Sequence, residues 1–124
     1  MRCPCRKKRE AETYAECCEP YHKGGEAAPT AEALMRSRYS AFALKDAAYL
    51  IATWHKSTRP SRIDFTPDQE WSVLRIVSAA EQEDTATVEF VARSRIDGRI
   101  HDLHEVSRFV REQGRWFYID GVIQ

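Results

Sequence analysis

The second half of this chain contains four runs rich in branched and aromatic residues, joined by connections so short that they admit only hairpins. The runs are Trp71 to Ala80, Thr85 to Arg95, Asp102 to Arg111 and Arg115 to Val122. Typical turn residues occupy the junctions, namely Glu83-Asp84, Asp97-Gly98 and Gln113-Gly114. A parallel connection needs about a dozen residues or more, so neighbouring runs must pair antiparallel. The sequence therefore predicts a four-stranded antiparallel meander.

The residues before this sheet predict helices. Thr30 suits a helix N-cap, and the residues that follow recur at helical spacing: Leu34, Met35, Arg38, Tyr39, Ala41 and Phe42. Asp46 can cap a second helix that carries Tyr49, Leu50, Thr53 and Trp54 on one face. A short third helical turn is predicted from Thr66, with Pro67 at its first position and Gln69 completing a capping box. Helices followed by hairpins indicate an α+β domain shaped as a cone, which often encloses a pocket.

Length and charge exclude several classes of protein. The chain has 124 residues, enough for one domain, and its 19 basic side chains balance 19 acidic ones. A neutral chain is a poor partner for duplex DNA, whose phosphates need a basic surface. No window approaches the roughly 18 to 20 consecutive apolar residues of a membrane helix. The charged N-terminus lacks the apolar stretch of a secretory signal, so we expect a cytoplasmic protein.

All the cysteines lie near the N-terminus, at Cys3, Cys5, Cys17 and Cys18. Two disulfides or four independent thiols are the alternatives to a metal site. Nothing indicates an oxidising compartment, and both close pairs are poorly placed to bridge internally. Four soft ligands in two close pairs suit tetrahedral zinc, with His22 as an alternative to one thiolate. Four protein ligands leave no open position on the metal, so we expect a structural role.

The chain divides into three zones by composition. Residues 1–23 form the cysteine-rich zone, which includes the basic run Arg6-Lys7-Lys8-Arg9. The stretch from Lys23 to Pro29, with its glycines and proline, is typical of a linker. Residues 30–124 have the pattern of an ordinary globular domain. Positive charge near a tetrathiolate site would offset the negative charge of the cluster, and it also suits an acidic partner.

Several blocks of the sequence, taken in order, resemble the YchJ-like family of small bacterial proteins. The blocks are Cys3-Pro4-Cys5, Tyr14 to Cys18, Thr30 to Ala41, Thr53-Trp54-His55, Val88 to Ala92, Leu103-His104-Glu105 and Ser107-Arg108-Phe109. The resemblance implies a SEC-C zinc motif in residues 1–23, similar to the zinc tail of the SecA motor, with the four cysteines as ligands. It also implies a cone-shaped nuclear-transport-factor-two-like domain in residues 30–124. The loop of residues 6–16 is longer than in that motif and lacks its Gly-Ser-Gly turn.

Two functions agree with this resemblance. The first is a zinc-containing binding or adaptor protein, whose zinc motif contacts a protein or ribonucleoprotein partner. The alternative is a small-molecule binder, or an isomerase-like or dehydratase-like enzyme, that uses the pocket of the cone. Family members of this shape often form homodimers through the exposed face of the sheet, so a homodimer is a further expectation. Fold alone does not choose between these functions.

Candidate pocket residues come mainly from the strands. The polar candidates are His55, His101, His104, Glu105, Arg108, Tyr118 and Asp120. Strand alternation places His104 on the face opposite Glu105, and it places Asp120 on the same face as Tyr118. If that face is concave, Asp120 lies among aromatic side chains and its pKa rises, as in a carboxylate base. His104 and Asp120 are therefore the catalytic candidates. No nucleophile and base occur at a recognisable spacing, so the sequence leaves enzymatic activity undecided.

Overall fold

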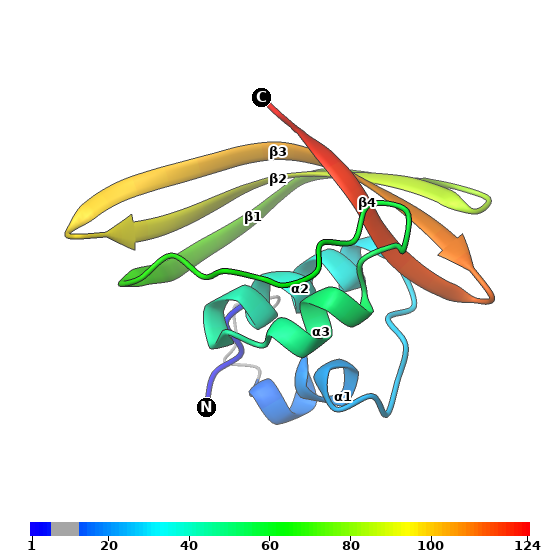
Figure 1. Ribbon diagram of the computed structural model, residues 1–124, viewed down its shortest axis with the longest axis horizontal. Coiled ribbons are helices and arrows are strands. Elements are labelled where there is room, and N and C mark those ends of the chain that lie inside the picture. The colour runs from blue at the N-terminus through cyan, green and yellow to red at the C-terminus, as the bar shows by residue number, and fades with distance from the viewer. Residues whose placement is uncertain (6–12) are drawn as a thin grey trace.

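The structure is a computed structural model that describes residues 1–5 and 13–124. Its elements follow one another in the order η1 (Tyr14–Glu16), α1 (Glu19–His22), α2 (Ala31–Leu44), α3 (Ala47–Ala52), β1 (Gln69–Gln82), β2 (Thr85–Ile96), β3 (Arg99–Glu112) and β4 (Arg115–Ile123). The strands form one antiparallel sheet in the order β1-β2-β3-β4. Figure 1 shows the sheet curving over α2 and α3. The predicted α+β cone with a four-stranded meander is confirmed.

Side-chain caps define the two main helices, as the sequence predicts. The Thr30 hydroxyl accepts a hydrogen bond from the Ala33 amide at 3.0 Å, which starts α2. Lys45 ends that helix in a left-handed conformation, with φ of 58°. Asp46 then caps α3 by accepting from the Tyr49 amide at 3.1 Å. These caps set where both helices begin. Helix α2 packs against β1, β2 and β4, and α3 packs against α2.

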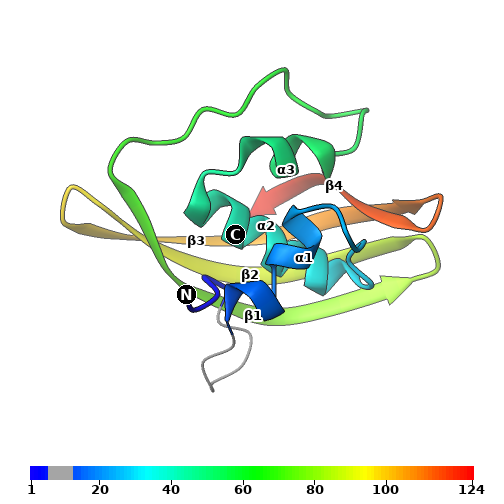
Figure 2. The same cartoon turned by 90° about the horizontal axis from the view of Figure 1, so that it is seen from below.

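The predicted helical turn at Thr66 is wrong. Asp68 adopts a left-handed conformation with φ of 59°, which ends any helix after Pro67. Gln69 is already the first residue of β1, and its side chain donates to the Ser94 hydroxyl at 3.1 Å instead of capping a helix. Figure 2 shows the long connection from α3 running beside the helical layer to the start of β1.

Hairpin turns set the register of the strands. Asp97 and Gly98 both have positive φ, at 50° and 78°, as a two-residue type I′ turn requires. The Gln113-Gly114 turn has the same form, with φ of 53° and 76°. Such turns match the right-handed twist of the strands they join. The meander is therefore specified largely by local turn chemistry.

A β-bulge in β4 changes which side chains face the cone. Phe109 pairs with Tyr118 and Arg108 pairs with Asp120, so Ile119 is an extra residue without a partner across the ladder. Tyr118 consequently lies with Phe109 on the concave face, whereas Asp120 lies with Arg108 on the outer face. The prediction that Asp120 and Tyr118 share a face is wrong, because strict alternation fails at one inserted residue.

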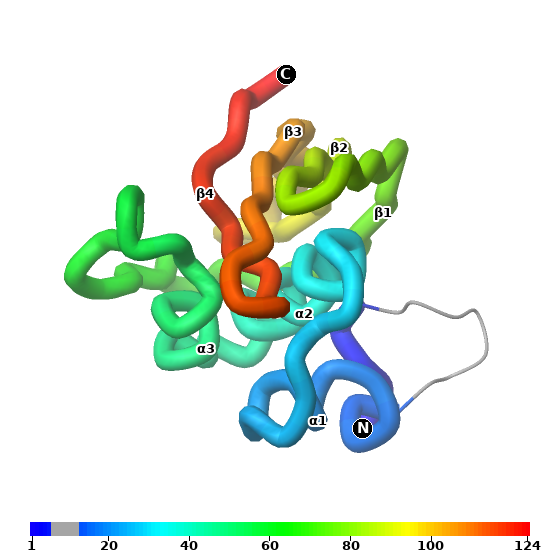
Figure 3. Tube along the Cα trace, turned by 90° about the vertical axis from the view of Figure 1, so that its right-hand side faces the viewer, coloured from blue at the N-terminus to red at the C-terminus, as the bar shows by residue number. Residues whose placement is uncertain are grey.

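The N-terminal segment packs on the side of α2 away from the sheet (Figure 1, Figure 3). Cys3, Cys5 and Cys18 are buried in the same core cluster as Leu34 and Met35 of α2. The basic run of residues 6–9 lies outside the described residues, and so does most of the loop that precedes Cys17, so the role expected for the run stays a prediction. The division of the chain into a motif of residues 1–23 and a domain of residues 30–124 stays a prediction. In the part of the chain that the structure describes, no helix is long and apolar enough to span a membrane.

Candidate functional site

The four cysteines lie together beneath α2. Neighbouring sulfurs are separated by 3.7 Å between Cys3 and Cys5, 3.5 Å between Cys5 and Cys17, and 3.8 Å between Cys17 and Cys18. All four sulfurs lie within 4.8 Å of one another. They are free thiols, since a disulfide needs sulfurs about 2.05 Å apart. The structure therefore brings together the four residues that the sequence singles out.

The spacing of the sulfurs fits a tetrahedral metal site. A Zn–S distance of about 2.3 Å places the corners of a tetrahedron about 3.8 Å apart, which is close to the spacing of these sulfurs. Hydrogen bonds from the Cys18 and Cys5 thiols lower the pKa of the Cys3 thiol. The hydrogen bond between Cys18 and Cys3 raises the pKa of the Cys18 thiol, and burial raises the pKa of the Cys17 thiol. Without a metal, the cluster therefore favours ionisation of one thiol, that of Cys3. A divalent cation stabilises further thiolates.

Short local elements hold the cysteines in place. Thr13 caps η1 by accepting from the Glu16 amide at 3.3 Å, and Cys17 follows as the last residue of that turn. Cys18 then precedes α1, which begins with Glu19. The Cys3 sulfur lies 3.6 Å from the Ser40 hydroxyl of α2. The cluster is therefore built against α2, and it ties the N-terminal segment to the cone.

His22 does not replace a cysteine in the cluster. Its Nε2 donates to the Ser37 carbonyl oxygen at 2.7 Å, so in the neutral ring its Nδ1 accepts from the Tyr14 hydroxyl at 2.6 Å. Both ring nitrogens are thus engaged away from the sulfurs. The ring also packs against Tyr49 of α3, with centroids 4.6 Å apart. His22 therefore joins α1 to the helices of the cone.

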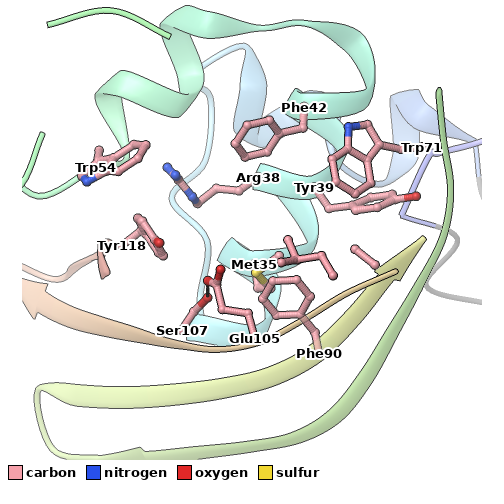
Figure 4. A pocket seen from close by; sticks show the side chains of 12 residues that line it. Met35, Arg38, Tyr39, Phe42, Trp54, Trp71, Phe90, Glu105, Ser107 and Tyr118 are labelled. Carbon is pink, nitrogen blue, oxygen red and sulfur yellow. Dashed lines mark hydrogen bonds between the residues drawn. The ribbon is translucent and has the colours of Figure 1, made fainter. Parts of the chain in front are cut away.

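A cavity of about 180 Å³ lies between α2 and the concave face of the sheet (Figure 4). Half of its lining residues are aromatic. The lining residues are Met35, Arg38, Tyr39, Phe42, Trp54, Trp71, Phe90, Ala92, Leu103, Glu105, Ser107 and Tyr118. The cavity and the cysteine cluster therefore lie on opposite sides of α2, and the polar residues of the cavity are few.

Arg38 is the buried charge of this cavity. Its side chain is almost fully enclosed, with the residue only 3% exposed. Nη1 donates to the Leu50 carbonyl oxygen at 2.8 Å and to the Thr53 hydroxyl at 2.7 Å. The guanidinium carbon lies 4.6 Å from the Tyr118 ring centroid and 5.1 Å from that of Trp54. Burial lowers the pKa of Arg38 to about 10, so the guanidinium stays charged at neutral pH.

Glu105 supplies a carboxylate to the same cavity. Its Oε2 accepts a hydrogen bond from the Ser107 hydroxyl at 2.5 Å, and Figure 4 shows the pair facing the cavity from β3. Gly121 of β4 pairs with Ser107, and a Cβ at this glycine would overlap the Glu105 carboxylate. A glycine is therefore needed at position 121 for Glu105 to hold this position.

The two catalytic candidates do not line the cavity. His104 Nε2 lies 2.7 Å from an oxygen of Glu89 on the outer face of the sheet. Arg108 donates two hydrogen bonds of 2.7 Å to Asp120, and hydrogen bonding to Arg108 lowers the pKa of that carboxyl. The expected rise in the pKa of Asp120 is therefore wrong. A catalytic role for either residue stays a prediction that the arrangement of the cavity does not support.

The other polar candidates divide between the cavity and the surface. Glu105 and Tyr118, two of the candidates chosen from the sequence, do line the cavity. His55 instead lies 2.9 Å from Glu112 at the surface, and His101 is exposed. Arg38 and Ser107 also line the cavity, although neither is among the seven polar candidates. The signal was present, because Arg38 lies within the apolar stripe of α2.

The cone and the cysteine cluster define a protein with a nuclear-transport-factor-two-like domain and a SEC-C-type N-terminal motif. Residues 30–121 match the family described as "YchJ, middle NTF2-like domain". The chain is 52% identical to a UPF0225 protein from Bordetella pertussis, over 98% of this chain and 92% of that one. It is 48% identical to a UPF0225 protein from Streptomyces coelicolor, over 96% and 93% of the two chains. The chain belongs to the YchJ-like UPF0225 family.

Solved structures of similar proteins share the whole fold. A solution structure of a SEC-C motif containing protein from Rhodopseudomonas palustris is 35% identical, with a TM-score of 0.86 over 98% of both chains. A crystal structure of a SEC-C motif containing protein from Psychrobacter arcticus is 28% identical, with a TM-score of 0.83 over 100% of this chain and 83% of that one. The likeness therefore includes the N-terminal segment as well as the cone.

Proposed function

We propose that this chain is a zinc-stabilised binding protein, whose ligand is a small molecule held in the cavity of the cone. The observation that carries the proposal is the aromatic-lined cavity with Arg38 and Glu105 facing it. Ligand sites are typically concave and mostly apolar, with a few convergent polar groups, and this cavity has that composition. The cysteine cluster lies away from it, so zinc and ligand have separate roles.

Zinc in this proposal is structural. Cys3, Cys5, Cys17 and Cys18 would hold it with four sulfur ligands, which leaves no open coordination position. Its contribution is to fix the N-terminal segment against α2, since structural zinc sites supply folding free energy directly. Free thiols of this kind persist in a reducing compartment, which agrees with a cytoplasmic protein.

Metal analysis tests the zinc site. Purified protein should contain one zinc per chain and should show almost no thiol that reacts before the protein is denatured. The Cys18→Ser variant should lose the metal, because a serine hydroxyl is a poor zinc ligand. Less than half an equivalent of zinc in the wild-type protein, with about four reactive thiols, would contradict the proposal.

Calorimetric titration tests the cavity. Benzyl alcohol is a suitable neutral probe, because a cavity of about 150 Å³ already holds benzene and this one measures about 180 Å³. Saturable binding to the wild-type protein, and none to an Ala92→Leu variant that fills the cavity, is the expected result. Equal heats from both proteins would place the probe elsewhere and refute the cavity as the binding site.

One observation favours a second candidate, an isomerase-like or dehydratase-like enzyme. The Glu105 carboxylate faces the cavity and accepts from Ser107, an arrangement that suits a general base. A ligand that the wild-type protein converts and the Glu105→Gln variant only binds would establish this candidate. A ligand that both proteins release unchanged would leave a binding protein.

Capture of a protein or ribonucleoprotein by the zinc motif, and a homodimer through the sheet, stay predictions. The basic run that suits an acidic partner lies outside the described residues. A pull-down with wild-type and Cys18→Ser protein tests the adaptor role, which requires that the variant lose its partners. Sedimentation analysis of the zinc-loaded protein tests the dimer, and a monomer at high concentration would exclude it.

A further inference from the structure

Arg38 carries a positive charge that its surroundings do not neutralise. Both of its hydrogen bonds use Nη1, and their acceptors are the uncharged oxygens of Leu50 and Thr53. Within residues 1–5 and 13–124, Arg38 makes no ion pair, and its Nε and Nη2 make no hydrogen bond. Removing a charge from water is costly unless it is paired and hydrogen-bonded. Two nitrogens of this guanidinium remain for a ligand.

The neighbours of Arg38 are aromatic rather than acidic. Trp54 and Tyr118 present their ring faces to the guanidinium, which compensates only part of its lost hydration. Burial raises the pKa of Tyr118 and of Tyr49 to about 12, so neither phenol supplies a negative charge at neutral pH. Figure 4 shows the Arg38 side chain extending across the cavity between these rings.

Glu105 does not take the place of a counter-ion. Its carboxylate is held by the Ser107 hydroxyl and forms no ion pair with Arg38 in the described structure. It does place one negative charge in the same cavity. A ligand with a single anionic group near Arg38 is therefore favoured over one that brings a second anionic group towards Glu105.

We propose that the cavity binds a small aromatic monocarboxylate, whose carboxylate accepts hydrogen bonds from Nε and Nη2 of Arg38. Arginine presents these donors as a planar fork that matches both oxygens of a carboxylate. The apolar ring of the ligand packs among the aromatic side chains of the wall. The size also agrees, because a cavity of about 150 Å³ holds one benzene ring and this one is slightly larger, at about 180 Å³. The inference rests on the proposed function and specifies its ligand class.

Calorimetric titration at pH 7 with benzoate and benzyl alcohol tests the inference. The two probes share the ring and nearly the same size, and they differ in charge. Benzoate should bind the wild-type protein about tenfold more tightly, because charge-assisted hydrogen bonds are stronger than neutral ones. The Arg38→Gln variant should lose this preference. Arg36→Gln is the matched control, since Arg36 lies on the same helix, pairs with Glu32 and does not line the cavity.

A second variant keeps the inference testable if Arg38→Gln does not fold. Glu105→Gln removes a negative charge that repels benzoate from the cavity. Benzoate should therefore bind severalfold more tightly, while benzyl alcohol binds as before. Weaker benzoate binding in that variant would overturn the inference. Equal affinity of the wild-type protein for both probes would also overturn it while leaving the proposed function intact. Failure of both probes to bind would refute the proposed function itself.

Discussion

Filling the cavity should make the protein more stable and abolish binding. Ala92 is the residue to change, because it is 1% exposed, lies on β2 and lines the cavity. The Ala92→Leu substitution adds three carbon atoms to a space of about 180 Å³. Natural proteins keep such a space at the expense of stability when function needs it. A gain in stability together with a loss of binding would therefore indicate a cavity that is kept for a ligand and not a packing defect.

The size of the effect follows from the buried carbons. Three methylene equivalents at about 0.8 kcal/mol each give a ceiling of about 2.4 kcal/mol. Fixing the leucine side chain costs about 0.5 to 1 kcal/mol, so the expected gain is about 1.5 kcal/mol. For a domain of this size that gain raises the melting temperature by about 5 °C. Thermal and urea denaturation followed by circular dichroism measure both quantities.

Ala41→Leu is the matched control for this prediction. Ala41 is fully buried on α2 and does not line the cavity, so the same three carbons have no space to enter. Overpacking of this kind costs about 1 to 3 kcal/mol. The reasoning fails if Ala92→Leu destabilises the protein as much as Ala41→Leu does, or if Ala92→Leu still binds benzyl alcohol.

Three further predictions concern the metal, a glycine and a surface ion pair. Stripping zinc with a chelator should lower the melting temperature and expose Cys18 to thiol reagents, and an unchanged melting temperature would argue against a structural metal. Gly121→Ala should destabilise the protein by displacing Glu105, and the cost should largely disappear in a Glu105→Ala background, which a double-mutant cycle measures. Asp120→Asn should cost less than about 1 kcal/mol at pH 7, since its ion pair with Arg108 is exposed. Because the folded pKa of Asp120 is lowered, that contribution is present above the ordinary pKa and is lost as pH falls through the folded value. Denaturation midpoints of wild type and Asp120→Asn should therefore converge in acid, and a constant gap would contradict the ion pair.

Features governed by local chemistry were predictable from the sequence. Thr30 and Asp46 act as helix caps, and the Asp97-Gly98 and Gln113-Gly114 turns form the expected hairpins. The four cysteines were also predictable as a cluster, because few arrangements of such close pairs suit anything other than a metal. In each case the signal lies in a few adjacent residues.

Features that depend on a single residue or on distant packing were not predictable. The extra residue Ile119 leaves no mark in the sequence, yet it moves Asp120 from the concave to the outer face. The left-handed conformation of Asp68 likewise replaces a plausible helix start with a turn. The apolar stripe of α2 indicates that Arg38 is buried, but it does not indicate that Trp54 and Tyr118, which come from other elements, pack against the guanidinium. Sequence alone therefore placed Asp120 on the same face as Tyr118, whereas its placement of His104 opposite Glu105 agrees with the structure.

The indole N–H resonances of the three tryptophans test the binding site most directly. Trp54 and Trp71 line the cavity, whereas Trp116 is buried outside it and serves as an internal reference. During a titration of the wild-type protein with benzoate, the resonances of Trp54 and Trp71 should shift along one saturable curve while that of Trp116 stays in place. Shifts of all three resonances without saturation, or no shift at all, would contradict a binding site in the cone.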